Sequence, residues 1–311
     1  MSNRRLALTL ALAGTIMLSA CGRVEAKGNV TPFQVAAAAS GLDTSRIELL
    51  TGYKGTLNQK EGVFKVNAPR TDLQVTIAGV KMTPSMGLTS WASFQKAGAR
   101  TMVMGDMVMT EDQVNTVMSV ALDNGLEVTG LHDHFLWDSP RVMFMHLAGL
   151  GSEEQLAGAV GKVLAKIRAT SGGRGETPTA NLSPANTTLD PKTIEGVLGE
   201  KGELSNGVYK VTLGRTTTMH GVQVGNTMGV NTWAAFVGSD AQAVVDGDFV
   251  MHEDELQGVL KALRGAGINI VAIHNHMVGE SPRMMFLHYW GVGSTTDLAK
   301  GLRAALDVTQ R

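Results

Sequence analysis

The 311-residue chain has little of three things that would point to a specialised class of protein. Its single cysteine, Cys21, excludes an internal disulfide. Its 27 basic and 28 acidic residues nearly cancel, so it lacks the positive charge of nucleic-acid-binding proteins. Aromatic residues make up only 5%. Hydrophobic residues make up 43% and charged residues 18%, which is typical of a globular protein stabilised by its own core.

The N-terminus has the pattern of a bacterial lipoprotein signal. Arg4 and Arg5 precede an apolar run over residues 6–18, which is too short to span a bilayer securely. The sequence Leu-Ser-Ala-Cys that ends at Cys21 resembles a lipobox, in which cleavage precedes the cysteine and its thiol carries a diacylglyceryl group.

We therefore predict a signal peptide over residues 1–20 and a tether over 21–41. Two acyl chains on Cys21 would hold the protein on a membrane without a transmembrane helix. No later segment has an apolar stretch of membrane-spanning length. The predicted location is the cell envelope, outside the cytoplasm. A plain secretory signal with a chance cysteine is the alternative.

The rest of the chain is a tandem repeat. Six of the eight histidines form two copies of one pattern with a constant offset of 142 positions, and these are His132, His134 and His146 in the first copy and His274, His276 and His288 in the second. The start of each copy also matches, with Leu42-Asp43 equivalent to Leu189-Asp190 at an offset of 147. A linker rich in Gly, Ser, Thr and Pro separates them. We predict a first repeat over residues 42–168, a linker over 169–188 and a second repeat over 189–311.

Each repeat has the pattern α-β-β-β-β-α-β-β-α. Asp43 and Asp190 are predicted N-caps of the first helix. Thr110 and Gln113 form a capping box before a helix over residues 114–122, and Ser152 and Ser294 open the last helices. The predicted strands are residues 62–66, 73–80, around Trp91, 100–109, 126–135 and 141–147, with their second-copy equivalents. This mixture predicts an α+β fold of two homologous repeats, each a mostly antiparallel sheet with flanking helices.

The histidines are predicted to share one face of a hairpin. Residues two apart in a strand face the same side, which puts His132 beside His134. A hairpin centred on Ser139 would pair His132 with His146. Three imidazoles in this arrangement match the ligand set of a catalytic zinc site, and they also suit copper, iron or nickel.

Other polar residues near the histidines leave alternatives open. Asp106/Asp248 and Glu111/Glu253 could add a carboxylate ligand, but we interpret them as turn or helix-cap residues. Arg141 and Arg283 lie at the mouth of the hairpin, where each could bind a carboxylate or phosphate or pair with an acid in the turn. A metal-free anion pocket and a purely structural histidine cluster both remain alternatives to a metal site.

Several tempting features are interpreted as structural. Of Met102, Met104, Met107 and Met109, only the last remains Met in the second copy, so we interpret this cluster as core packing and not as a copper site. Trp91 and Trp233 are interpreted as buried strand aromatics. Motifs of serine hydrolases and phosphate-binding loops are absent from the sequence, so a hydrolase here would need a metal or a histidine acid/base.

The histidine segments resemble those of a known family. Residues 273–290 (IHNHMVGESPRMMFLHYW) and 131–146 (LHDHFLWDSPRVMFMH) are similar to the LppY/LpqO family, a commonly duplicated domain of bacterial lipoproteins. The resemblance extends from Leu42 to Leu306. It implies a secreted or lipid-anchored protein and brings no catalytic residues with it.

The sequence thus predicts a lipid-anchored envelope protein with a His/His/His/Arg pocket in each repeat. The expected ligand is a divalent metal such as zinc, or an anion, and hydrolysis is the reaction class considered. The alternative is a non-enzymatic binding or scaffold protein of the envelope. The expected partner is the membrane, through the anchor, and no nucleic acid.

Overall fold

The computed structural model describes residues 41–310. The predicted signal peptide, Cys21 and nearly all of the tether lie outside the described residues. Among the described residues, no helix is both long and apolar enough to span a bilayer.

The described part of the chain has an α+β fold, as predicted. The helices of the first repeat are α1 (Thr44–Thr51), α2 (Val114–Asp123) and α3 (Glu153–Ala169), and those of the second are α4 (Pro191–Leu198), α5 (Leu256–Gly265) and α6 (Thr295–Asp307). The strands of the main sheet are β1 (Gly55–Asn58), β2 (Val63–Pro69), β5 (Thr89–Ala97), β6 (Arg100–Thr110), β7 (Glu127–His132) and β9 (Val142–Gly151), then β10 (Gly202–Ser205), β11 (Val208–Gly214), β14 (Asn231–Gly238), β15 (Ala243–His252), β16 (Asn269–His274) and β17 (Met284–Gly293).

These twelve strands form one antiparallel sheet that runs through both repeats. Its order is β1-β2-β5-β6-β9-β7-β16-β17-β15-β14-β11-β10, so the second half mirrors the first. The repeats join where β7 pairs antiparallel with β16, through Leu131 and Ile273. These two residues are equivalent positions of the two copies, so the pairing has local two-fold symmetry.

Short elements lie between the long strands. They are the strands β3 (Thr76–Ile77), β4 (Val80–Lys81), β8 (Asp138–Ser139), β12 (Thr217–Met219) and β13 (Val222–Val224), and the 3₁₀ turns η1 (Pro84–Met86), η2 (Glu111–Gln113), η3 (Pro184–Asn186), η4 (Asn226–Met228) and η5 (Glu253–Glu255). The prediction of a full strand over residues 73–80 was wrong. The chain folds there into the two-residue strands β3 and β4, reversing at Ala78 and Gly79, which both have positive φ.

The helix starts follow their capping residues. The Asp43 side chain accepts a hydrogen bond from the Arg46 N–H, and that of Asp190 accepts one from the Lys192 N–H, as predicted. Ser152 and Ser294 cap α3 and α6 in the same way. The capping box of Thr110 and Gln113 is also confirmed, although it opens η2, which continues into α2.

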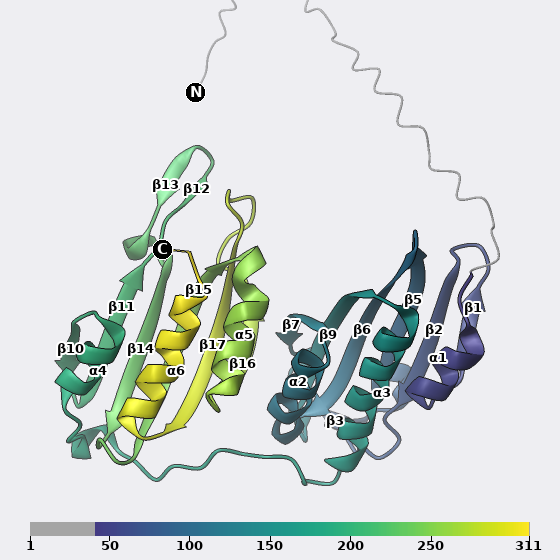
Figure 1. Cartoon of the computed structure of the whole chain (residues 1–311). Helices are drawn as coiled ribbons and strands as arrows, with labels where there is room; N and C mark the ends of the chain where they lie inside the picture. Colours follow the sequence, from purple (N-terminus) through teal and green to yellow (C-terminus); the bar gives the residue numbers. More distant parts are fainter. Residues whose placement is uncertain (1–40, 311) are drawn as a thin grey trace, which may run out of the picture. The chain divides into compact units, whose positions relative to one another are not determined.

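Alternation along the strands creates two different faces. The three helices of each repeat cover one face of its strands (Figure 1), and side chains such as Phe249 and Leu287 are fully buried there. The opposite face has only small apolar clusters, built around Val108 and Phe144 in the first repeat and around Val250 and Phe286 in the second. The histidines lie on this second face, which leaves them open to ligands.

Candidate metal centre

Two neighbouring strands place Asp248 beside His288. These residues are directly paired across β15 and β17, so their side chains lie on the same face of the sheet. Their chain neighbours Phe249 and Leu287 point into the helix-covered core. His274 ends the adjacent strand β16, and His276 follows it in the loop toward β17.

The predicted hairpin register was wrong by two residues. His132 pairs with Phe144, and His146 pairs with Gly130. The connection between β7 and β9 is centred on Asp138, one residue before the predicted Ser139, and this moves the partner of His132 by two residues. A β-bulge between Val128 and Gly130 shifts the register by one more residue farther along the hairpin. Because the error is an even number, all these side chains stay on the predicted face. A Cβ at Gly130 would lie 3.4 Å from His146 Cδ2, which is an ordinary contact distance, so the histidine cluster does not require glycine at this position.

Three potential metal-ligand atoms converge in the second repeat. The Nε2 atom of His276 lies 3.0 Å from Asp248 Oδ2 and 3.1 Å from His274 Nε2. The potential ligand atoms of Asp248, His274 and His276 all lie within 4.8 Å of one another. Two ligands at ordinary zinc distances and a tetrahedral angle are roughly 3.3 Å apart. The group could therefore hold a divalent metal ion with little adjustment.

Backbone carbonyls fix which imidazole nitrogen is available. His276 Nδ1 lies 3.1 Å from the Gly229 carbonyl oxygen, and His288 Nδ1 lies 3.2 Å from that of Gly247. A carbonyl can only accept, so each Nδ1 carries the proton. In the neutral ring, Nε2 then has a free lone pair, as in metal-ligating histidines whose other nitrogen donates to the protein.

Burial strongly affects the charges in this group. Asp248 is 3% exposed, and its Oδ1 and the Nδ1 of His274 have no hydrogen-bond partner among the described residues. Burial raises the pKa of Asp248, while attraction to His288 and His276 opposes the rise. Burial, and then repulsion from His288 and His276, lowers the pKa of His274 to about 4. His274 is therefore neutral at physiological pH, the form that binds metals.

Ring stacking holds the imidazoles in place. His288 stacks on His274 with ring centroids 4.7 Å apart, and His276 stacks on Phe286 at 3.6 Å. The structure thus brings the three predicted histidines together. The potential ligand group, however, consists of His274, His276 and Asp248, and His288 packs beside it.

The interpretation of Asp106 and Asp248 as turn or cap residues was wrong. Both are buried within long strands, where they pair with His146 and His288. Glu111 and Glu253, in contrast, do begin the 3₁₀ turns before α2 and α5 and are exposed. The sequence places Asp248 in a strand with alternating side chains, but the alternation does not say which strand lies beside it. Only the pairing of β15 with β17 shows that Asp248 faces the same side as the histidines.

The first repeat has the same residues in a looser arrangement. His134 Nε2 lies 3.7 Å from Asp106 Oδ2, compared with 3.0 Å for the equivalent atoms in the second repeat. His132 stacks on His146, and His134 stacks on Phe144. Burial is the main cause that lowers the pKa of His132 and of His134. Within residues 41–310, three ligand atoms lie within 4.8 Å of one another in the second repeat.

The arginines pair with acidic residues. Arg141 donates two hydrogen bonds to Asp133, and its Nε lies 3.8 Å from Glu111 Oε1. It lines a cavity of about 620 Å³ together with His132. In the second repeat, Asn275 replaces Asp133, and Arg283 Nε lies 3.6 Å from Glu253 Oε1.

The methionines and tryptophans only partly follow their predicted roles. Met107 and Met109 are fully buried core residues, but Met102 and Met104 are exposed, so core packing does not explain them. Trp91 and Trp233 are half-buried on the open face of the sheet, and not core residues. Lysine ammonium groups lie over both indole rings, Lys65 over Trp91 and Lys210 over Trp233.

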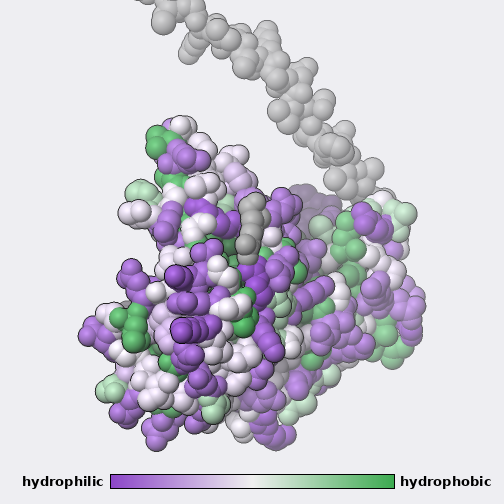
Figure 2. Space-filling view, turned by 60° about the vertical axis from the view of Figure 1, so that its left-hand side comes forward, coloured by the Kyte–Doolittle hydropathy of each residue, from purple (hydrophilic) through white to green (hydrophobic). Residues whose placement is uncertain are grey.

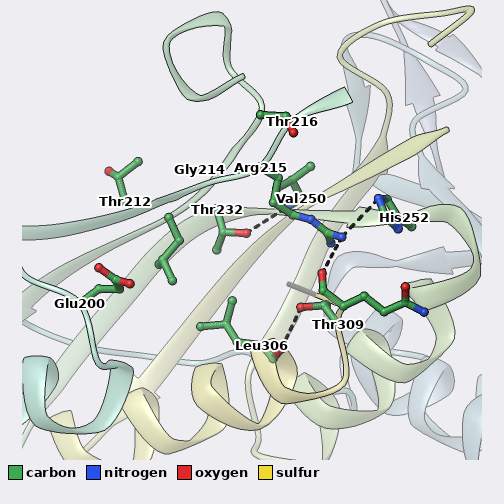
Figure 3. A pocket seen from close by; sticks show the side chains of 12 residues that line it. Glu200, Thr212, Gly214, Arg215, Thr216, Thr232, Val250, His252, Leu306 and Thr309 are labelled. Atoms are coloured by element: carbon green, nitrogen blue, oxygen red, sulfur yellow. Dashed lines mark hydrogen bonds between the residues drawn. The ribbon is translucent and has the colours of Figure 1, made fainter. Parts of the chain in front are cut away.

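A separate cavity of about 560 Å³ lies at the end of β11 (Figure 3). Arg215 enters it and donates to the buried carboxylate of Glu255, at 2.6 Å, and to the Gln310 carbonyl. Burial alone would raise the pKa of Glu255, but hydrogen bonds from Arg215 and from backbone N–H groups lower it. The histidines of the candidate metal centre do not line this cavity.

Comparison with known proteins identifies the chain only at the family level. A family model described as Domain of Unknown Function (DUF1259) matches residues 45–166 and 192–308. No curated protein gives a significant match. A similar solved structure is that of a trimeric bacterial microcompartment shell protein, PduB, with 12% identity over 80% of this chain and 87% of that chain. Its TM-score of 0.19 is too low to support an argument about fold or function.

Proposed function

The chain belongs to the Domain of Unknown Function (DUF1259) family, and from the site in its second repeat we propose that it is a divalent-metal-binding protein. The observation that carries the proposal is the set of lone pairs around His276 Nε2. With Nδ1 donating to Gly229, this nitrogen faces the Asp248 carboxylate at 3.0 Å and His274 Nε2 at 3.1 Å. In the neutral His276 ring, the lone pairs of Nε2 and of the Asp248 carboxylate repel each other at this distance unless a cation lies between them.

Asp248 also favours a metal ion over an anion. A buried carboxylate in the pocket repels anionic ligands, and the arginines that could offset it are paired with acidic residues. Two neutral imidazoles and one carboxylate are a ligand set used by catalytic zinc sites.

Metal-assisted hydrolysis is the reaction class that this site supports best. Three protein ligands leave one coordination position for water, and the bound metal would lower the pKa of that water. The side chains of His274 and His276 are 28% and 30% exposed, so a substrate can approach. Asp248, held by the sheet, would orient the metal ion, and the Gly229 carbonyl would orient His276.

We also propose that the protein is held in the cell envelope by lipid on Cys21, as in the LppY/LpqO lipoproteins that it resembles. The support is the lipobox-like sequence Leu-Ser-Ala-Cys that ends at Cys21. Mass spectrometry of the N-terminal peptide should find a diacylglyceryl group on Cys21, and Cys21→Ser should move the protein out of the membrane fraction. An unmodified mature N-terminus would contradict the anchor.

Calorimetric titration of the full chain, purified without a histidine tag, tests the metal site. We expect one tight zinc site per chain in the wild-type protein. Asp248→Asn keeps the side-chain shape but removes the charged ligand, so zinc affinity should fall by more than about 100-fold, since even outer-shell changes cost 10–100-fold. Asp106→Asn, the matched change in the looser first repeat, should leave this tight site intact.

The alternative is a non-enzymatic scaffold in which a protonated His276 forms an ion pair with Asp248. In that case Zn²⁺, Mn²⁺, Co²⁺ and Ni²⁺ would all fail to bind stoichiometrically. Chelator would also leave the thermal stability of the purified protein unchanged.

A further inference from the structure

Four exposed apolar side chains of the first repeat lie on segments that adjoin the loop after His134. Val80, Met86, Leu136 and Trp137 come from three separate segments, namely β4, η1 and the loop before β8. Their exposed fractions range from 47% for Met86 to 78% for Trp137. Because the fold does not bury them, their apolar character needs another explanation.

The second repeat presents the same feature. Val222, Met228 and Val278 are 63–81% exposed. Val222 lies on the hairpin formed by β12 and β13, which projects beyond the end of the sheet, and hydrophobic residues stand out on this hairpin in Figure 2. We call these seven residues the apolar rim.

The duplication provides an internal comparison. Three rim pairs occupy equivalent positions at the offset of 142, and these are Val80 with Val222, Met86 with Met228, and Leu136 with Val278. Exposure alone does not preserve apolar character, since Met104 is 54% exposed and its equivalent is Asp246, and Val271 is 49% exposed and its equivalent is Thr129. A solvent-exposed position places no packing demand on its side chain. Retention of apolar side chains in both copies therefore indicates a shared ligand contact.

The rim residues are next to segments that contact the histidines. Met228 precedes Gly229, whose carbonyl accepts the hydrogen bond of His276, and Val278 lies two residues after His276. Backbone hydrogen bonds between Thr218 and Ser281 join the β12–β13 hairpin to the same loop. In the first repeat, Ile77 pairs with Asp138, next to Trp137, in the same way.

From these relationships we propose that the rim residues of the second repeat, Val222, Met228 and Val278, bind the acyl chain of a free single-chain amphiphile. Its anionic oxygen head group, a carboxylate or phosphate, would reach the metal in the second repeat, so this part of the inference rests on the proposed function. A divalent metal prefers anionic oxygen, while rim side chains gain by covering an alkyl chain. A bilayer is a poorer occupant, because inserting the rim would press the Asp248 carboxylate and the imidazoles toward hydrocarbon.

Titration with a series of linear carboxylates tests the proposal. The zinc-loaded full chain would be titrated with butanoate, hexanoate, octanoate and decanoate below their micellar concentrations. Affinity should rise with length by up to about fourfold per CH₂ group, the value for full burial. Met228→Ser combined with Val278→Ser should flatten this dependence while leaving butanoate affinity unchanged. Leu204→Ser, which alters an exposed residue of β10 outside the rim, is the control and should keep the full dependence.

The outcomes separate this inference from the metal proposal. An affinity independent of chain length, or a length dependence that survives in the rim variant, would overturn the amphiphile proposal. A length dependence that is equal with and without zinc would support the rim and refute the metal-bound head group. Quenching of Trp137 fluorescence by phosphatidylcholine vesicles with brominated chains, absent from Trp137→Phe, would show that a bilayer is the occupant instead.

Discussion

Two equivalent arginines, Arg70, which is buried, and Arg215, which is half-buried, are neutralised by different carboxylates. Arg70 and Arg215 both follow a long strand, and their N–H groups make the same backbone bond, to Leu88 and Val230. Arg70 is neutralised by Asp72, through two hydrogen bonds, whereas Arg215 is neutralised by Glu255. A buried guanidinium needs such a partner because an unpaired charge is costly to remove from water.

Asp72 predicts a specific dependence of stability on pH. The Arg70 hydrogen bond is the main cause that lowers the pKa of Asp72 to about 2 from 3.8. A lowered carboxyl pKa stabilises the folded state above the unfolded pKa, and this contribution is lost as pH falls through about 2. Asp72→Asn should destabilise the protein by about 1–2 kcal/mol at pH 7, because Asp72 is partly exposed.

Denaturant unfolding of wild type and variant between pH 7 and pH 2 checks this prediction. The difference in unfolding free energy should persist down to about pH 4 and shrink toward pH 2. A difference that stays constant across this range would show that the charge of Asp72 does not stabilise the fold.

At the residue scale, the sequence predicted the members of the site better than their roles. The repeated spacing was enough to select His274, His276 and His288. It did not reveal that Asp248 belongs to the potential ligand group or that His288 stacks on His274 beside it. That distinction depends on which strand lies beside which, and long-range pairing leaves no trace in the local alternation of β15 or β17.

At the element scale, close helix packing depends on one glycine. A Cβ on Gly161 of α3 would lie 2.0 Å from the Leu50 carbonyl oxygen of α1, whereas one on Gly158 would meet nothing within 4 Å. The first glycine is therefore required by the contact between α1 and α3. The second only weakens the helix.

Replacing each glycine by alanine separates these effects. Gly161→Ala should destabilise the protein by roughly 1–3 kcal/mol through overpacking. Gly158→Ala should stabilise it by about 0.5–1 kcal/mol through helix propensity. Thermal unfolding of the two variants measures both, and equal shifts of the two melting temperatures would contradict the packing argument.

Elements with strong local signals were predictable, and short ones were not. The capped helices and the long strands β2, β5 and β6 follow from caps and alternation. The four-residue strands β1 and β10 were missed because so short a segment shows no clear period. The register of the β7–β9 hairpin was missed because local alternation does not show on which residue the connection is centred, and that residue is Asp138 and not Ser139.

At the scale of the whole molecule, each repeat donates and accepts equivalent hydrogen bonds across the junction with the other repeat. The Asn115 side chain in α2 exchanges two hydrogen bonds with the backbone of Ile270, and Gln257 in α5 does the same with Val128. Both clamped residues lie at the bulges, where the ladder leaves backbone groups unpaired. Each repeat thus supplies hydrogen-bond partners for unpaired backbone groups in the last strand of the other repeat. The sequence of one repeat alone could not predict these bonds.

Removing one clamp should weaken this junction. Asn115→Ala leaves the Ile270 N–H and C=O without partners, at a cost of about 1–3 kcal/mol. Hydrogen exchange should become faster at the Ile270 amide, while the Val128 amide, held by Gln257, serves as the internal control. Unchanged exchange at Ile270 would show that the clamp does not hold the two repeats together.

The central claim, that Asp248, His274 and His276 form a divalent metal site, is tested most directly by anomalous diffraction. Crystals of the full chain would be soaked in zinc, and data collected on both sides of the zinc absorption edge. The account predicts one strong anomalous peak about 2.0–2.2 Å from His276 Nε2, His274 Nε2 and an Asp248 oxygen. Density maps with no anomalous peak between these three side chains, or with zinc bound only elsewhere, would contradict it.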